Sequence, residues 1–171
     1  MNATPDTFFF ALRPPSDSAR ELSHLRDALA SPGMTKIALH RLHITLLLVD
    51  LRLPLHILFE RSKQALSSSP LPTCRVMVDR LIGGAHSTLV MPSEPLLGLQ
   101  NMQAKLASRL AMSGIFTPKW WRFCPHLTLL YNGPRLDIPI DPIGWRADEL
   151  LFIRSHVGQT RHEVIGSWTL G

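Results

Sequence analysis

The amino-acid sequence predicts an α+β fold with antiparallel sheets, folded as a single domain over residues 1–171. Three observations support this prediction. The chain has 171 residues, 45% hydrophobic and 18% charged, which is enough to bury one core. Segments typical of strands and helices alternate without the regular strand–helix–strand rhythm of a parallel sheet. One short pattern occurs twice, about half a chain apart, which indicates two related halves.

The first half contains two strand-like and two helix-like segments. The strand-like segments are short runs of aromatic, branched and other apolar residues, and the helix-like segments repeat apolar residues at spacings of three and four. Proline and glycine mark the ends, for example at Pro32-Gly33. In order, we expect a strand at 8–12, a helix from an N-cap at Ser16 or Ser18 to Leu29, a strand at 42–49 and a helix from Pro54 to Leu66.

The second half follows a similar order. Gly83-Gly84 separates two strand-like runs and predicts a hairpin, and a single apolar stripe predicts a long helix that ends at Gly114. Residues rich in proline and glycine predict loops at 133–134 and 139–142. In order, we expect strands at 75–81 and 87–91, a helix at 95–114, and strands at 123–131, 149–155 and 163–170.

The repeated pattern is His-apolar-Thr-Leu. It occurs as His43-Ile44-Thr45-Leu46 and again, 83 residues later, as His126-Leu127-Thr128-Leu129. Because side chains alternate between the two faces of a strand, each copy places its histidine and threonine on one face and its two apolar residues on the other. If a pseudo-two-fold axis relates the halves, the two polar faces meet across a cleft between lobes, where small molecules commonly bind.

Two histidines that face one phosphodiester can act as an acid–base pair. A neutral imidazole at His43 or His126 can deprotonate an attacking water or hydroxyl, while the opposite imidazolium protonates the leaving oxygen. The hydroxyls of Thr45 and Thr128 can donate hydrogen bonds to the non-bridging phosphate oxygens. This scheme requires no metal and no cofactor. His40 and His43 have no cysteine or carboxylate at ligand spacing, so we expect no metal site there.

On these residues the chain resembles the two-histidine (2H) phosphoesterase superfamily, and most closely the bacterial RNA 2′,3′-cyclic phosphodiesterases, also called 2′-5′ RNA ligases. Residues 8–12 are similar to that family's first strand, 42–46 and 124–129 to its two motifs, and 155–170 to its closing strands. The resemblance implies a bilobal fold of two pseudo-symmetric halves, each with an antiparallel sheet and helices, around an active-site cleft. It also implies metal-independent opening of a 2′,3′-cyclic phosphate to a 2′-phosphate and, in some members, reversible 2′-5′ RNA ligation.

The chain departs from this family at two positions. Members often carry arginine where this chain has Tyr131, and commonly tyrosine where it has His162. Strict alternation from His126 turns Tyr131 to the opposite face, so Tyr131 lines the cleft only if the strand ends or bends. Another cation is then expected to supply the positive charge. Arg161 is the preferred candidate, and the others are Arg122, Arg13 and Lys36.

Composition indicates the class of partner. The formal net charge is +5, and arginine outnumbers lysine 14 to 4, which suits phosphate oxygens. We therefore expect RNA ends or nucleotide cyclic phosphates as partners. Trp120 and Trp121 are expected to pack in the core or between lobes, with stacking on RNA bases as the alternative. Both Cys74 and Cys124 are expected to be buried apolar residues.

No apolar run approaches the roughly 20 residues of a membrane span, and residues 1–7 lack the basic start of a signal peptide. We expect a cytoplasmic monomer that does not bind membranes. Two alternatives to an RNA cyclic phosphodiesterase remain open at this point. One is a phosphodiesterase for another small cyclic phosphate, and the other is a module that binds RNA ends without turnover.

Overall fold

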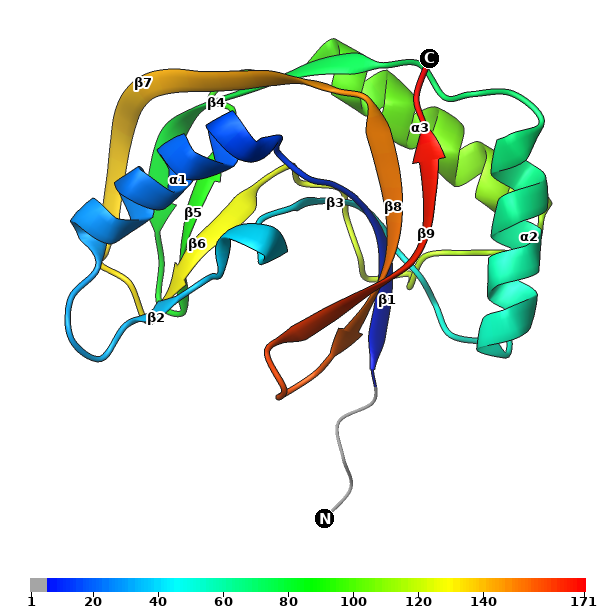
Figure 1. Ribbon diagram of the computed structural model, residues 1–171, viewed down its shortest axis with the longest axis horizontal. Coiled ribbons are helices and arrows are strands. Elements are labelled where there is room, and N and C mark those ends of the chain that lie inside the picture. Colours follow the sequence, from blue (N-terminus) through cyan, green and yellow to red (C-terminus); the bar gives the residue numbers. More distant parts are fainter. Residues whose placement is uncertain (1–5) are drawn as a thin grey trace.

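A computed structural model describes residues 6–171 of the chain. Residues 1–5, which belong to the segment expected to lack a signal peptide, lie outside the described residues. The described residues form two antiparallel sheets and three α-helices, which confirms the predicted α+β class (Figure 1). Within them no helix is long and apolar enough to cross a membrane.

The first sheet has four strands in the order β3-β1-β8-β9. Their bounds are β1 Thr7–Leu12, β3 Ile44–Leu48, β8 Glu149–His156 and β9 Arg161–Thr169. The second sheet has five strands in the order β2-β6-β5-β4-β7. Their bounds are β2 Thr35–Lys36, β4 Cys74–Gly83, β5 Ser87–Met91, β6 Leu127–Tyr131 and β7 Leu136–Ala147. In each sheet one motif strand lies beside a strand from its own half of the chain, β3 beside β1 and β6 beside β5. Each sheet also includes strands from the other half, β8 and β9 in the first sheet and β2 in the second.

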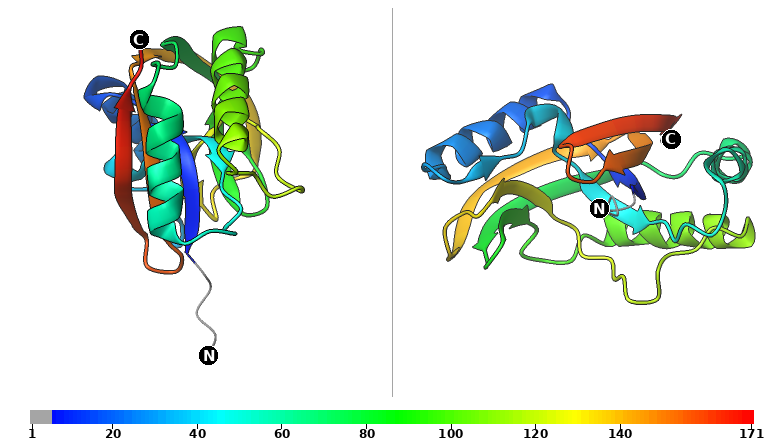
Figure 2. Two further views of the ribbon diagram at one scale, coloured as in Figure 1. Left: turned by 90° about the vertical axis from the view of Figure 1, so that its right-hand side faces the viewer. Right: turned by 90° about the horizontal axis from the view of Figure 1, so that it is seen from below.

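The helices cover the outer faces of the sheets. They are α1 Ser16–Leu29, α2 Leu55–Ser67 and α3 Leu97–Met112, and a short 3-10 helix, η1, spans Leu39–Arg41. The helix α1 contacts β6 and β7 of the second sheet, whereas α2 and α3 contact each other on the far side of the molecule (Figures 1 and 2). The expected serine cap of α1 is wrong, because Pro15 occupies the N-cap position and makes no side-chain cap.

The two sheets are joined by one nearly continuous strand. Only Asp148 separates β7 of the second sheet from β8 of the first, and Figure 1 shows the pair arching over the top of the molecule. The expected loop at 139–142 is therefore wrong, because these residues lie inside β7. Pro139 and Pro142 are tolerated there because β7 is an edge strand and its register against β4 shifts between Val78 and Arg80.

The two faces of the first sheet bury different clusters. One face places Phe10, Leu12 and Phe152 in the main core, which continues under the second sheet. The opposite face carries a small separate cluster, namely Phe9, Ala11, Leu151 and Ile153 with Leu48 packed against it. Both sides of the central strands are therefore fixed by packing, and the small cluster forms the floor beside the candidate site.

Candidate active site

The two His-x-Thr motifs share one backbone irregularity. Against β1, Phe10 is in register with Leu47 and Ala11 with Thr45, so the register skips Leu46. Against β5, Thr88 is in register with Leu130 and Leu89 with Thr128, so the register skips Leu129. Each motif strand therefore has a β-bulge at the same motif position, directly after the threonine.

The bulge decides which face the following residue takes. In both strands two consecutive leucines are buried in the main core, Leu46 with Leu47 and Leu129 with Leu130. Alternation resumes one residue out of step, which turns Tyr131 to the face that also carries Thr128. Tyr131 accordingly lines the pocket, and its side chain is 44% exposed.

Each motif histidine is anchored by the backbone two residues before it. His43 Nδ1 lies 2.7 Å from the carbonyl oxygen of Arg41, and His126 Nδ1 lies 2.7 Å from that of Cys124. Because a carbonyl oxygen only accepts hydrogen bonds, Nδ1 is the protonated nitrogen in both rings. Nε2 of each ring is therefore the nitrogen left to accept or donate a proton at a substrate.

A pocket of about 220 Å³ lies between the two sheets at this point. The first sheet contributes side chains from β1, β8 and β9, and the second sheet contributes side chains from β6. The segment that leads into β3 contributes the rest. The lining residues are Thr7, Phe9, Ile37, Arg41, His43, Thr128, Tyr131, Ser155 and His162.

The pocket contains only some of the sequence-predicted site residues. His43, Thr128 and Tyr131 line it, whereas Thr45 and His126 do not. His126 nevertheless lies close enough for its charge to lower the pKa of His43. The histidine of one motif and the threonine of the other therefore share one cavity, so the two halves meet as the repeat predicted.

Of the other predicted cations, three point elsewhere. Arg161 is exposed at the start of β9, outside the pocket lining. Arg122 donates from Nη1 to the carbonyl oxygens of Lys119 and Trp121 in its own loop. Lys36 forms an ion pair with Asp27, 3.0 Å away.

Sequence reasoning missed the cation that does line the pocket. Arg41 lies in η1, and its side chain borders the cavity while its carbonyl holds His43. The predicted cation Arg13 does not line the pocket. Within residues 6–171, the Nε atom of Arg41 is buried without a hydrogen-bond partner. Unpartnered buried donors beside a cavity are the groups that a bound anion would satisfy. The signal in the sequence was the position of Arg41, two residues before the motif histidine.

Three rings converge on the wall formed by the first sheet. Phe9 stacks on His43 with ring centroids 4.8 Å apart, and His162 meets both rings edge-on, at 5.1 Å from His43 and 5.6 Å from Phe9. Burial, assisted by the charges of Arg13, His126 and Arg41, lowers the pKa of His43 to about 4 despite the opposing hydrogen bond to the Arg41 carbonyl. Without a bound anion, His43 is therefore neutral at pH 7.

The second histidine of the pocket lining is also neutral. Burial, together with the charges of His43, Arg41, Arg13 and His40, lowers the pKa of His162 to about 3. Within the described residues its Nδ1 is buried without a hydrogen-bond partner. Arg41 makes this side of the pocket electropositive, and no ion pair within 6–171 joins Arg41 to a carboxylate. Burial lowers the pKa of Arg13, and the charge of Glu149 opposes this lowering.

The depressed histidine pKa values predict that acid destabilises the fold. The unfolded chain binds protons near pH 6.5 that the folded chain excludes until about pH 4, so stability is full above pH 6.5 and falls as the pH drops below it. Between pH 7 and pH 5, His43 alone is expected to cost about 2 kcal/mol. Urea titrations at both pH values measure this loss.

His162→Phe keeps a ring but removes one titrating group, so we expect it to lose less stability than the parent over the same interval. His24→Asn on α1 serves as the matched control, because His24 is exposed. An equal loss in the parent, His162→Phe and His24→Asn would contradict this origin of the acid sensitivity.

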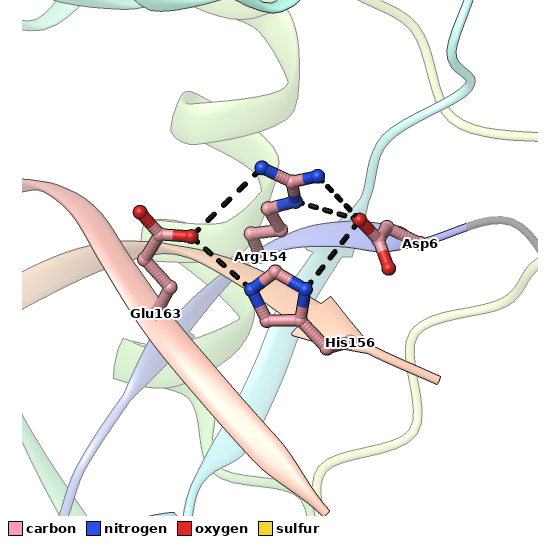
Figure 3. Close-up of polar contacts among 4 residues, drawn as sticks. All are labelled: Asp6, Arg154, His156 and Glu163. Carbon is pink, nitrogen blue, oxygen red and sulfur yellow. Dashed lines mark hydrogen bonds and ion pairs between the residues drawn. The ribbon is translucent and has the colours of Figure 1, made fainter. Parts of the chain in front are cut away.

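The pocket end of the first sheet is fixed on its other face by a charged cluster of Asp6, which directly precedes β1, with residues of β8 and β9 (Figure 3). Arg154 donates from Nε to Asp6 at 2.7 Å, and His156 Nε2 lies 3.2 Å from a carboxylate oxygen of Glu163. These residues alternate along the strands with Thr7, Ser155 and His162, so they lie on the face opposite the pocket. The cluster holds together the strand ends that present those three residues to the cavity.

Cys124 and Trp120 are not buried as the sequence predicts. Cys74 is buried as expected, but Cys124 is exposed, because it lies in the loop before β6 and contributes to the site through its carbonyl rather than its thiol. Trp120 is 74% exposed, so it packs neither in the core nor between the sheets.

Two antiparallel lobes with paired His-x-Thr motifs around a shared pocket define the class of the 2H phosphoesterases. A family model described as the 2′-5′ RNA ligase superfamily matches residues 14–159. The chain belongs to this superfamily. No curated protein matches the chain in sequence.

Several solved structures share the fold. E. coli LigT complexed with 3′-AMP is 22% identical with a TM-score of 0.76, and the match covers 98% of this chain and 99% of LigT. A structure described as a phosphoesterase is 22% identical with a TM-score of 0.79, covering 98% and 99%. The protein TT0787 of Thermus thermophilus is 16% identical with a TM-score of 0.75, covering 96% and 97%. At these identities the likeness establishes the two-lobed fold.

Proposed function

We propose that the protein hydrolyses 2′,3′-cyclic phosphodiesters of RNA or nucleotides to 2′-phosphates, with His43 and His126 as the acid–base pair. The observation that carries this proposal is the matched anchoring of the two rings. Each Nδ1 is held 2.7 Å from a carbonyl two residues upstream, so both Nε2 atoms are available for proton transfer. Titrating pairs held in fixed orientations beside a pocket are typical of acid–base catalysis.

The proposed reaction needs no reactant other than the cyclic phosphate and water. One histidine takes a proton from water as the water oxygen forms a bond to phosphorus. The bond between phosphorus and the 3′ oxygen breaks, and the other histidine gives its proton to that oxygen. The product carries a 2′-phosphate and a 3′-hydroxyl. If the 5′-hydroxyl of a second RNA end takes the place of water, the same step forms a 2′-5′ phosphodiester and leaves a 3′-hydroxyl, which would permit 2′-5′ RNA ligation. In the reverse of either reaction the two histidines exchange roles.

The remaining groups would hold the phosphate. Thr45 and Thr128 are proposed to donate hydroxyl hydrogen bonds to its non-bridging oxygens, and Tyr131 can add one neutral hydrogen bond from the same face as Thr128. Arg41 supplies the charge-assisted contact, because its side chain borders the pocket. A bound anion would also neutralise the electropositive wall and so raise the pKa of His43 towards its ordinary value.

The experiment that tests this function is hydrolysis of a 2′,3′-cyclic mononucleotide followed by phosphorus NMR of the product. We expect a 2′-phosphate, formed at an unchanged rate in excess chelator, because the proposed chemistry uses only side chains. A predominant 3′-phosphate would contradict the proposed leaving group, and chelator inhibition that a divalent metal reverses would contradict the two-histidine scheme.

The same assay separates the two alternatives. Turnover of other cyclic phosphodiesters without turnover of a nucleotide would identify a phosphodiesterase for another small cyclic phosphate. Binding of an RNA end without any product would identify a non-catalytic module that recognises RNA ends.

A further inference from the structure

The loop between α3 and β6 has an unusual composition. Residues 113–126 carry four aromatic side chains and the cations Lys119 and Arg122, but no aspartate or glutamate. Both views in Figure 2 show this yellow-green segment extending outward from the body of the molecule. It is an exposed, basic and aromatic surface.

The aromatic side chains of the loop divide into two groups. Trp121 and Phe123 are partly buried with ring centroids 6.5 Å apart, and Phe123 packs against the main core. Trp120 and Phe116 instead expose 74% and 50% of their surface. The inner pair attaches the loop to the fold, so the outer rings are presented to solvent on a supported base.

Hydrogen bonds hold the loop in this shape. The Trp121 amide donates to the Pro118 carbonyl at 3.0 Å, which closes a turn that carries Trp120. Arg122 Nη1 donates to the Lys119 carbonyl at 2.6 Å, within the same turn. At the start of the loop, the Asp50 amide donates to the Phe116 carbonyl at 2.8 Å and ties it to the end of β3. The exposed rings are therefore preorganised, which lowers the entropic cost of binding.

The loop leads directly into the catalytic motif. Its Cys124 carbonyl holds His126, and Trp120 precedes His126 by only six residues. Six residues span at most about 20 Å even when fully extended. A polymer with one end in the pocket can therefore reach Trp120 within a few monomer units.

We propose that residues 116–122 form a binding surface for single-stranded RNA, which holds the strand leading to the cyclic phosphate in the pocket. This inference rests on the proposed function, because in a polymer a 2′,3′-cyclic phosphate stands at the 3′ end of an RNA strand. Trp120 stacks an unpaired base, and Lys119 contacts backbone phosphate. Aromatic rings interleaved with cations are the usual platform for single strands.

The test compares a 2′,3′-cyclic mononucleotide with an unstructured oligoribonucleotide that ends in the same cyclic phosphate. Trp120→Ala is expected to lower kcat/KM for the oligoribonucleotide about tenfold or more, as loss of one stacked base does, and to leave the mononucleotide unchanged. Trp120→Phe is expected to restore most of the loss. Leu97→Ala, which removes an exposed apolar side chain on α3, is the matched control.

Charge is tested by the salt dependence of binding, measured by fluorescence anisotropy with a non-reacting oligoribonucleotide that ends in a 3′-hydroxyl. Lys119→Ala is expected to reduce the slope of log affinity against log salt by about 0.7, the value for one phosphate contact on a single strand. Lys63→Ala on α2 removes the same charge from an exposed position elsewhere and should leave the slope unchanged.

The outcomes separate this proposal from the proposed function. Equal losses on mononucleotide and oligoribonucleotide in Trp120→Ala would overturn the binding surface and assign the tryptophan a structural role. Unchanged oligoribonucleotide binding in Trp120→Ala and Lys119→Ala, or equal affinity for duplex RNA, would also overturn it. Absence of any cyclic phosphodiesterase activity would overturn the proposed function, whereas the anisotropy result would still decide whether the loop binds RNA.

Discussion

Replacing either His43 or His126 by alanine is expected to reduce turnover of a 2′,3′-cyclic mononucleotide by about 10²- to 10⁴-fold, the usual contribution of positioned proton transfer. The loss should appear mainly in kcat, because the imidazoles act on protons in the transition state whereas the threonines and Arg41 remain to bind phosphate. Steady-state kinetics of both variants measure the effect.

The double variant distinguishes a working pair from two independent contributions. Residues that act as a unit are strongly non-additive, so we expect the double replacement to cost little more than the worse single one. His56→Ala on α2 is the control, because His56 is exposed and lies outside the pocket lining. Near-normal turnover in a folded His43→Ala or His126→Ala variant, with folding checked by circular dichroism, would contradict the acid–base pair.

The sequence was sufficient to predict the fold class and the meeting of the two halves because both depend on periodic patterns. Alternation correctly predicts that Ile44 and Leu127 face the core, and the repeat predicts that His43 and Thr128 approach one another. Alternation fails where a strand is not regular. The bulges at Leu46 and Leu129 add one residue to each strand, so every later side chain changes face. In the sequence, only the consecutive leucines Leu46-Leu47 and Leu129-Leu130 indicate this change locally.

The cation of the pocket could not be predicted from strand patterns for a different reason. The sequence pattern places Arg41 in the loop before a strand that begins at residue 42, where nothing indicates the direction of its side chain. In the structure, residues 39–41 form a 3-10 helix, so Arg41 leaves the strand direction and turns its side chain to the pocket. Arg161, by contrast, pairs in register with His156 at the end of the β8–β9 hairpin. Arg161 therefore lies outside the pocket lining although it directly precedes His162 in the sequence.

Arg41→Ala is expected to lower kcat/KM for the cyclic mononucleotide by about 10- to 100-fold, because a charge-assisted hydrogen bond to an anion contributes about 1.5–3 kcal/mol. The substitution removes the side chain but keeps the carbonyl that holds His43, so it isolates the phosphate contact. Arg41→Lys should recover part of the loss, since lysine keeps the charge but not the planar pair of donors.

A second readout separates binding by Arg41 from mere support of the fold. The Arg41 charge is one of the causes that depress the pKa of His43, so its removal should raise that pKa, observable by NMR titration of the imidazole in the free protein. Arg161→Ala is the charge-matched control, and it should leave both kinetics and titration near those of the parent because Arg161 lies outside the pocket lining. Tyr131→Phe, which loses one neutral hydrogen bond, should cost less than Arg41→Ala. If Arg161→Ala were the damaging substitution and Arg41→Ala were neutral, the positive charge of the site would have to come from β9 rather than from η1.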